Sequence, residues 1–146
     1  ADNTINIKDH PTPESRIERV KELTEGRGAD VLLEVVGYPS VVTEGLQMLR
    51  KGGTFVEIGN IWPDSNVTLD VSKVLWGQVR IIPATHYDPY ILPVTVDMLT
   101  RTRDKYPLTR VMSHSFPLER IGEAFEAAEW AGKAEGTVVT RAMVAP

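Results

Sequence analysis

The sequence predicts an α/β protein built on a doubly wound, mainly parallel sheet. Three apolar runs, at residues 29–37, 54–59 and 79–83, are expected to be its central strands, and the β-branched composition of the first is typical of a strand buried on both faces. Segments with helical spacing of apolar residues alternate with these runs, as in βαβ units with right-handed crossovers. Because ligands bind such sheets at the carboxyl ends of the strands, the loops after the three runs are the candidate site.

The N-terminal part predicts a short strand followed by a helix. Residues 3–7 (NTINI) alternate weakly in polarity, as a strand does. Thr12 can cap the helix, Pro13 suits its first position, and Glu14 favours the positive end of its dipole. The glycines of residues 25–28 (EGRG) are expected to end it. Since the strand begins almost at once and no initiator methionine precedes it, we expect the chain to be part of a longer polypeptide.

Helices are expected between the remaining strands. Pro39 begins one that should run to the double glycine at residues 52–53. A short amphipathic segment at residues 69–77 precedes the third apolar run. A further helix is expected around residues 90–103, where the only proline falls in the first turn and is therefore tolerated.

The C-terminal part predicts a strand, a turn and a last helix. Residues 111–117 should form a short strand that turns at Pro117. The amphipathic helix that follows carries Ile121 and Phe125 on its apolar face. Residues 137–144 (TVVTRAMV) are expected to form one closing strand.

The composition of the 146 residues excludes several classes of protein. A formal charge of −4 gives no basis for binding nucleic acid, and no apolar run approaches the roughly 20 residues that a membrane helix needs. The absence of cysteine excludes disulfides and cysteine-liganded zinc, and the three histidines lie too far apart in sequence for a metal motif. We therefore expect no metal site, nucleic-acid partner or membrane partner for this chain, and a cytoplasmic location.

Four segments, taken in order, resemble the zinc-type medium-chain dehydrogenase/reductase family, the alcohol dehydrogenase superfamily. They are GRGADVLLEVVG (26–37), LQMLRKGGTFVEIG (46–59), VRIIPATHYDP (79–89) and SHSFPLERIGEAFEAA (113–128). The second segment alone would also suit a class I methyltransferase. The fourth is the most specific, because methyltransferases have no equivalent of it.

The resemblance implies an incomplete Rossmann-type domain that binds a nicotinamide cofactor, NAD or NADP. Residues 1–111 would be most of that domain, and residues 112–146 would return to a catalytic domain. Family members carry the zinc ligands and a GxGxxG phosphate loop before the region matched here, and this sequence contains no GxGxxG. In the usual strand order 3-2-1-4-5-6, residues 3–7 would be the third strand and residues 29–37 the fourth, with the first two strands absent. Zinc would be bound only through the missing N-terminal domain.

The same resemblance assigns cofactor contacts to the three loops at the strand ends. The first loop would lie beside the adenosine half, the second would contact the nicotinamide ring, and the third would reach its carboxamide through backbone groups. The candidate cofactor-binding residues are Val36, Gly37, Ile58, Gly59, Asn60, Ala84 and Thr85. The alternative is that the two glycines only terminate strands. No catalytic residue is expected on this chain.

The implied function is zinc-assisted hydride transfer between NAD(P) and an alcohol or carbonyl substrate, with the 146 residues alone expected to be inactive. Three alternatives stay open: a zinc-free quinone or enoyl reductase of the same superfamily, an S-adenosylmethionine-dependent methyltransferase, and a non-catalytic oligomerisation module. The resemblance also implies a homodimer or homotetramer that pairs through residues 79–83, since an apolar sheet edge invites a partner.

Overall fold

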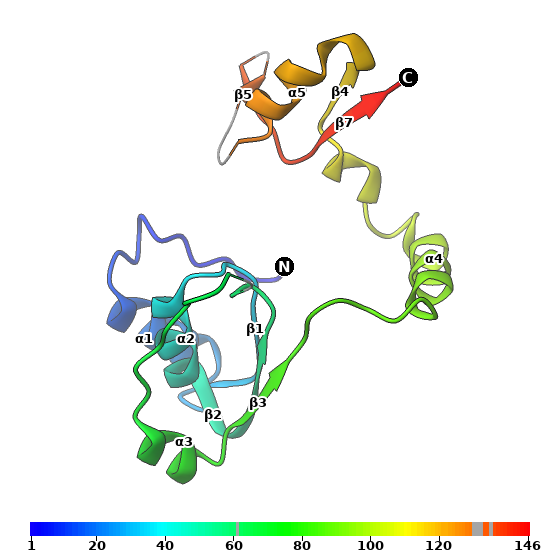
Figure 1. Cartoon of the computed structure of the whole chain (residues 1–146). Coiled ribbons are helices and arrows are strands. Elements are labelled where there is room, and N and C mark those ends of the chain that lie inside the picture. Colours follow the sequence, from blue (N-terminus) through cyan, green and yellow to red (C-terminus); the bar gives the residue numbers. More distant parts are fainter. Residues whose placement is uncertain (61, 130–132, 135) are drawn as a thin grey trace. The chain divides into compact units, whose positions relative to one another are not determined.

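The computed structural model describes residues 1–60, 62–129, 133–134 and 136–146, and these form two compact units. The first unit is Ala1–His86 and the second is Tyr87–Pro146 (Figure 1). The boundary expected between residues 111 and 112 concerned the domains of a longer polypeptide and is a different division from this one, so it stays a prediction.

A parallel sheet forms the centre of the first unit. Its strands are β1 (Ala29–Glu34), β2 (Leu49–Glu57) and β3 (Arg80–Pro83), in the order β1-β2-β3. Each neighbouring pair in the sheet is also consecutive along the chain, with a helix in the connection. The mixed α/β architecture and the parallel sheet expected from the sequence are confirmed.

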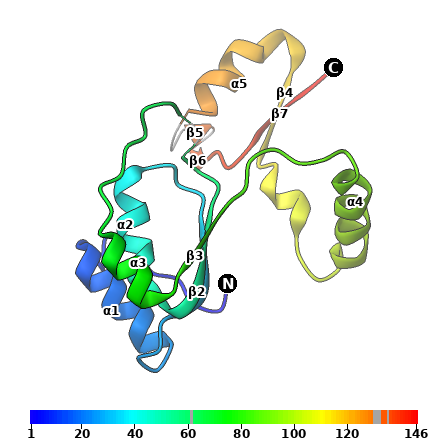
Figure 2. The same cartoon turned by 60° about the horizontal axis from the view of Figure 1, so that its bottom comes forward.

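Three helices lie on the same side of this sheet (Figures 1 and 2). They are α1 (Pro13–Leu23), α2 (Pro39–Met48) and α3 (Val71–Gly77). The predicted start of α1 is confirmed, because the Thr12 side chain caps the helix by accepting from Ser15 N at 3.2 Å. Asp70 caps α3 in the same way, accepting from Ser72 N at 3.0 Å.

A glycine lets α2 approach the sheet closely. Gly45 is buried on the inner face of the helix. A Cβ there would lie 2.9 Å from the ring of Phe55 and 3.0 Å from Leu32 Cδ1, so no larger residue fits without displacing its neighbours. Phe55, on the central strand, is fully buried as a result. This contact is the main apolar anchor between the helices and the strands that carry the candidate site.

The opposite face of β1 differs from the prediction of burial on both faces. Val31 and Leu33 point away from the helices and are 57% and 60% exposed. The apolar composition of a strand indicates that the strand can be buried, but it does not identify the element that covers it.

The predicted strand at residues 3–7 is wrong, since this segment has no regular structure. Asn6 instead organises a turn. Its backbone carbonyl accepts from Asp9 N and His10 N, both at 3.0 Å, and its side-chain oxygen accepts from Lys8 N at 2.9 Å. Local hydrogen bonds from an asparagine compete with strand pairing, and they prevail where no partner strand is beside the segment.

The end of α2 also differs from the prediction. The helix stops at Met48, and Leu49 is already extended, with φ −75° and ψ 147°. Leu49 lies opposite Ala29 of β1, so residues before the double glycine belong to the strand. Pairing with β1 therefore ends the helix earlier than the glycines would.

The second unit contains short elements, some of which pack around a small apolar cluster. In chain order these are α4 (Ile91–Thr102), the 3₁₀ helix η1 (Leu108–Val111), β4 (His114–Pro117), the 3₁₀ helix η2 (Leu118–Arg120), α5 (Ile121–Ala127), β5 (Lys133–Ala134), β6 (Thr137–Val138) and β7 (Ala142–Ala145). Phe116, Ala124 and Ala127 form the cluster, and β4, α5 and β7 pack around it. The helix expected around residues 90–103 is confirmed, and the strand expected over residues 111–117 is confirmed only over His114–Pro117.

The closing strand expected over residues 137–144 is two strands with different partners. β6 pairs antiparallel with β5, and β7 pairs parallel with β4. Between them the chain turns at Thr140 and Arg141, whose backbone N–H groups both donate to Ser113 Oγ. The prediction of one continuous strand is wrong, because residues 137–138 pair with β5 whereas residues 142–145 pair with β4.

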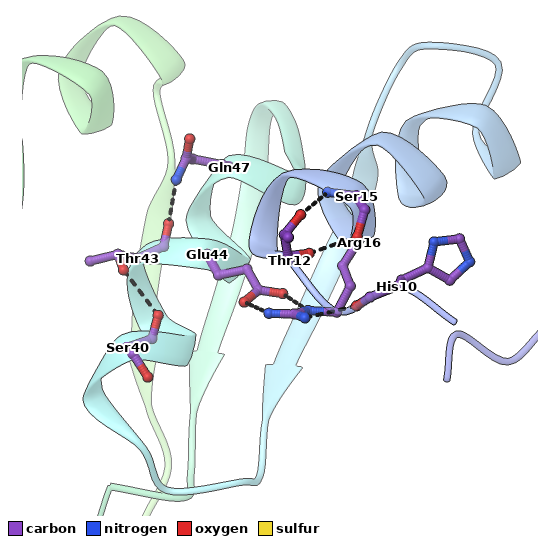
Figure 3. A network of polar contacts seen from close by, with 8 residues as sticks. All are labelled: His10, Thr12, Ser15, Arg16, Ser40, Thr43, Glu44 and Gln47. Carbon is purple, nitrogen blue, oxygen red and sulfur yellow. Dashed lines mark hydrogen bonds and ion pairs between the residues drawn. The ribbon is translucent and has the colours of Figure 1, made fainter. Parts of the chain in front are cut away.

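An ion pair joins α1 to α2 in the helical layer (Figure 3). Arg16 Nε and Nη2 donate to the two carboxylate oxygens of Glu44 at 2.6 and 2.7 Å, and Arg16 Nη1 donates to the His10 carbonyl at 2.9 Å. The hydrogen bond to Glu44 raises the pKa of Arg16 above its already high value. Both side chains are largely shielded, with 18% and 12% exposed. A two-point contact of this kind joins the two helices more strongly than a single hydrogen bond would.

We expect Glu44→Gln in the full-length protein to lower the free energy of unfolding by about 1–2 kcal/mol, because it leaves the shielded guanidinium with only part of its partner. Urea denaturation measures the change. Glu22→Gln is the matched control, since Glu22 pairs with Arg19 on the exposed surface of α1. The control should change stability by less than about 0.5 kcal/mol, and equal effects of the two variants would contradict this role of Glu44.

Candidate functional site

The carboxyl ends of the three parallel strands lie side by side. Glu34 at the end of β1 is opposite Glu57 in β2, which is opposite Pro83 in β3. The chain therefore leaves all three strands at the same end of the sheet. Every candidate residue expected from the sequence follows one of these strand ends within three residues: Val36, Gly37, Ile58, Gly59, Asn60, Ala84 and Thr85.

The first two loops touch each other backbone to backbone. Gly37 has a φ of +81°, and a Cβ on it would lie 2.6 Å from the Gly59 carbonyl oxygen. A Cβ on Gly59 would lie 2.5 Å from both Gly37 N and Glu34 Oε2. The two glycines therefore do more than terminate strands, because a side chain on either would force the loops apart.

A buried carboxylate lies beneath this contact. Glu34 is only 1% exposed, and its Oε1 accepts from Val36 N at 2.7 Å and from Gly37 N at 2.8 Å. Its Oε2 accepts from Gly59 N and from Asn60 Nδ2, both at 3.2 Å. The Glu34 carbonyl also accepts from Ile58 N and Gly59 N, at 3.0 and 3.1 Å. One residue thus binds the loops after β1 and β2 together.

Asn60 extends this network to a second carboxylate. Its backbone N–H donates to Glu57 Oε1 at 2.9 Å, and its Nδ2 is 3.1 Å from the same oxygen. Because Nδ2 also faces Glu34, the amide oxygen must point the other way, since it would be repelled by two carboxylates. Asn60 Oδ1 is buried there with no hydrogen-bond partner among the described residues.

The environment of Glu34 favours its ionised form. Burial is the largest single influence and by itself raises the pKa, because a charge is costly away from water. The backbone hydrogen bonds from Gly37, Val36 and Gly59 outweigh burial and hold the pKa of Glu34 below its usual range. Glu34 is therefore an anion at neutral pH. Among the described residues no cation pairs with it.

An open pocket of about 530 Å³ lies between the loops after β2 and β3. This volume is within the range of small-molecule and cofactor sites. The third loop is held against the second by a hydrogen bond from Ala84 N to the Glu57 carbonyl at 2.9 Å. Four of the candidate residues line the pocket, namely Ile58, Asn60, Ala84 and Thr85, and Glu57 and His86 line it with them. Val36, Gly37 and Gly59 are not among its lining residues and lie instead at the contact of the first two loops.

Reasoning from the sequence missed the two acidic residues that organise this edge. The signal was present: Glu34 and Glu57 each interrupt an apolar run shortly before a glycine. A carboxylate inside a buried strand is unusual unless hydrogen-bond donors surround it. Val36 N and Gly37 N are local donors, but Gly59 N and Asn60 Nδ2 come from the next strand connection, 25 and 26 residues away, and no local pattern displays them.

Within the described part of the chain, no group of three or more His, Cys, Asp or Glu side chains could hold a metal ion. None of the described helices is long and apolar enough to cross a membrane.

We expect Gly59→Ala to lower the free energy of unfolding by about 1–3 kcal/mol, because the new methyl group would overlap the Glu34 carboxylate and Gly37 N. Chemical denaturation of the full-length protein measures the loss. Gly122→Ala in α5 is the matched control, since a Cβ there meets nothing within 4 Å. That control should leave stability unchanged or raise it by about 0.5 kcal/mol; wild-type stability of the Gly59→Ala protein would show that the two loops do not need this close contact.

A sequence profile described as "Zinc-binding dehydrogenase" matches residues 1–101. Among curated proteins, the chain is 36% identical over 126 residues to the erythritol/L-threitol dehydrogenase of Mycolicibacterium smegmatis, which covers 86% of this chain and 33% of that protein. It is 32% identical over 114 residues to the L-threonine 3-dehydrogenase of Bacillus subtilis, covering 77% of this chain and 32% of that protein.

Solved structures give the same result. The alcohol dehydrogenase of Thermotoga maritima superposes with a TM-score of 0.71 at 27% identity, over 79% of this chain and 31% of that one. The alcohol dehydrogenase of Thermus sp. ATN1 superposes with a TM-score of 0.72 at 23% identity, over 84% and 33% respectively, and supports the fold. The chain spans about a third of the length of the relatives it matches. On the profile match and these relatives together, the chain belongs to the zinc-binding dehydrogenase family.

Proposed function

We propose that this chain is the nicotinamide-binding part of a dehydrogenase, and that NAD(P) binds at the loops after β1, β2 and β3. One observation carries the proposal: the candidate residues from three separated segments lie along one edge of the parallel sheet, where four of them line a pocket of about 530 Å³. The carboxyl ends of parallel strands are the general place for ligands in such folds.

The residues at this edge fit a nicotinamide cofactor. Ile58 is 37% exposed in the pocket wall and offers an apolar surface for a flat ring. Ala84 and Thr85 line the same pocket, and in this proposal their backbone groups contact the carboxamide. Next to this pocket, Gly37 and Gly59 let the loops after β1 and β2 approach each other closely. In this proposal the cofactor supplies hydride transfer when bound, and the chain holds and orients it.

For the whole protein we propose reversible hydride transfer between NAD(P) and an alcohol or carbonyl compound. The family match and the relatives named for erythritol, threitol and threonine support a small alcohol as the substrate. In the same proposal, zinc is bound by residues of the full-length protein outside this region. There it would polarise the substrate oxygen. The cytoplasmic location also remains part of the proposal.

The comparisons favour this function over the alternatives raised by the sequence. The matched profile and the relatives are dehydrogenases, which supports neither a methyltransferase nor a non-catalytic module. A zinc-free reductase differs from the proposal in metal content. Elemental analysis of the full-length protein separates these two, since the proposal requires stoichiometric zinc.

Pairing of two copies through β3 is a further part of the proposal. β3 is the last strand of the described sheet, and Ile81 and Ile82 on it are 45% and 48% exposed. An apolar strand edge of this kind is suited to join a second sheet across a two-fold axis.

The cofactor proposal is tested by filling the pocket. Ala84→Trp in the full-length protein keeps the backbone hydrogen bond to Glu57 and places an indole among the pocket residues. We expect the Kd for NADH or NADPH, measured by fluorescence titration, to rise at least about tenfold. Thr68→Trp is the control, because Thr68 lines a different pocket beside α3. Unaltered binding by the Ala84 variant, or no binding by the wild type, would contradict the proposal.

The pairing proposal is tested by Ile81→Lys. A charged side chain on the exposed strand edge should oppose strand pairing and give a monomer by light scattering, with NADH binding retained. Val94→Lys, on the exposed surface of α4, controls for the added charge. An Ile81 variant that keeps the wild-type mass would remove β3 as the interface.

A further inference from the structure

The buried Glu34 carboxylate accepts four hydrogen bonds in the candidate site but does not line the pocket. We propose that Glu34 is a positioning residue of the cofactor site: its buried anionic carboxylate holds the first two loops in the binding geometry before the cofactor arrives. This inference rests on the proposed function, because the positioned loops are those assigned to NAD(P).

Each oxygen of the carboxylate serves a different loop. Oε1 accepts from Val36 N and Gly37 N at 2.7 and 2.8 Å and so fixes the loop after β1. Oε2 accepts from Gly59 N and Asn60 Nδ2, both at 3.2 Å, and so fixes the loop after β2. The two loops are therefore held by one group, and displacing that group would release both.

The four donors require an ionised carboxylate rather than any polar side chain. A carboxylate is the only side chain of this size with two oxygens that both act purely as acceptors. A glutamine at position 34 would direct its NH₂ either at Val36 N and Gly37 N or at Gly59 N and Asn60 Nδ2. In either orientation donors face donors, so one of the two loops loses its anchor. A buried N–H without an acceptor is unfavourable enough to move the loop that carries it.

The held residues connect directly to the pocket wall. Gly59, which is bonded to Glu34, lies between Ile58 and Asn60 in the chain, and both of these line the pocket. The Asn60 side chain joins Glu34 to Glu57, which lines the same pocket. Loosening the carboxylate would therefore shift the wall against which the ring is proposed to bind. A wall that is already ordered avoids part of the entropy cost of binding, which is the physical advantage of the arrangement.

The test is Glu34→Gln in the full-length protein, with Glu44→Gln as the matched control. The control removes the same charge from a shielded carboxylate, but in the helical layer between α1 and α2, away from the three loops. We expect Glu34→Gln to raise the Kd and the KM for NAD(P)H at least about tenfold, with kcat at saturating cofactor within about threefold of wild type. The control should leave Kd and KM unchanged. A merely structural role would lower the folded fraction, and thus the apparent kcat, without moving KM.

A measurement on the wild type keeps the inference testable if the variant does not fold. The amides of Val36, Gly37 and Gly59 should be protected from hydrogen exchange before cofactor is added and should gain little protection when NADH binds. Fast exchange of these amides until NADH is present would overturn the inference, as would a Glu34→Gln protein with wild-type Kd and KM. If the wild type binds neither NADH nor NADPH, the proposed function fails and this inference fails with it. If the wild type binds and the variant binds equally well, the inference alone fails.

Discussion

A buried carboxylate, with no cation paired to it among the described residues, organises the loops at the strand ends of the candidate site. Removing a charged group from water is costly, and the structure offsets that cost at Glu34 with N–H donors instead of an ion pair. Three of the four donors are backbone N–H groups, so the loops that carry them must lie against the carboxylate. That convergence brings Gly37 against Gly59 and leaves no room for a Cβ on either. The glycines are thus a consequence of the buried anion as much as of any ligand.

Local signals in the sequence predicted the starts of helices well. Thr12 and Pro13 begin α1 as expected, because a cap and a fixed φ act through bonds within one turn of chain. Predictions that depend on pairing with another segment of the chain were wrong. Residues 3–7 alternate like a strand but form a turn at Asn6, and the double glycine at residues 52–53 does not end α2, because pairing with β1 begins at Leu49. Strand pairing is decided by distant segments, so a local pattern can show only that a strand is possible.

The candidate site was likewise predicted only in part from the sequence. The order of segments indicated which loops meet, since the ends of parallel strands must share one edge. The group that holds those loops was not indicated, because Glu34 is a strand residue by position and its Oε2 partners come from the connection after β2. An acidic residue at an apolar strand end is the feature that sequence reasoning can use in such folds. It points to donors that must be supplied from elsewhere in the chain.

The two shielded glutamates of the first unit show why charge alone does not define a role. Glu44 meets the guanidinium of Arg16, whose long side chain can follow small movements of α1 against α2 without losing the contact. Glu34 meets backbone N–H groups, which can move only if the loops move. The first arrangement tolerates motion between helices, whereas the second transmits any displacement of the carboxylate to the loops. A site that must present backbone groups to a ligand at fixed positions gains from the second kind of contact, and in this unit that contact lies at the carboxyl ends of the strands.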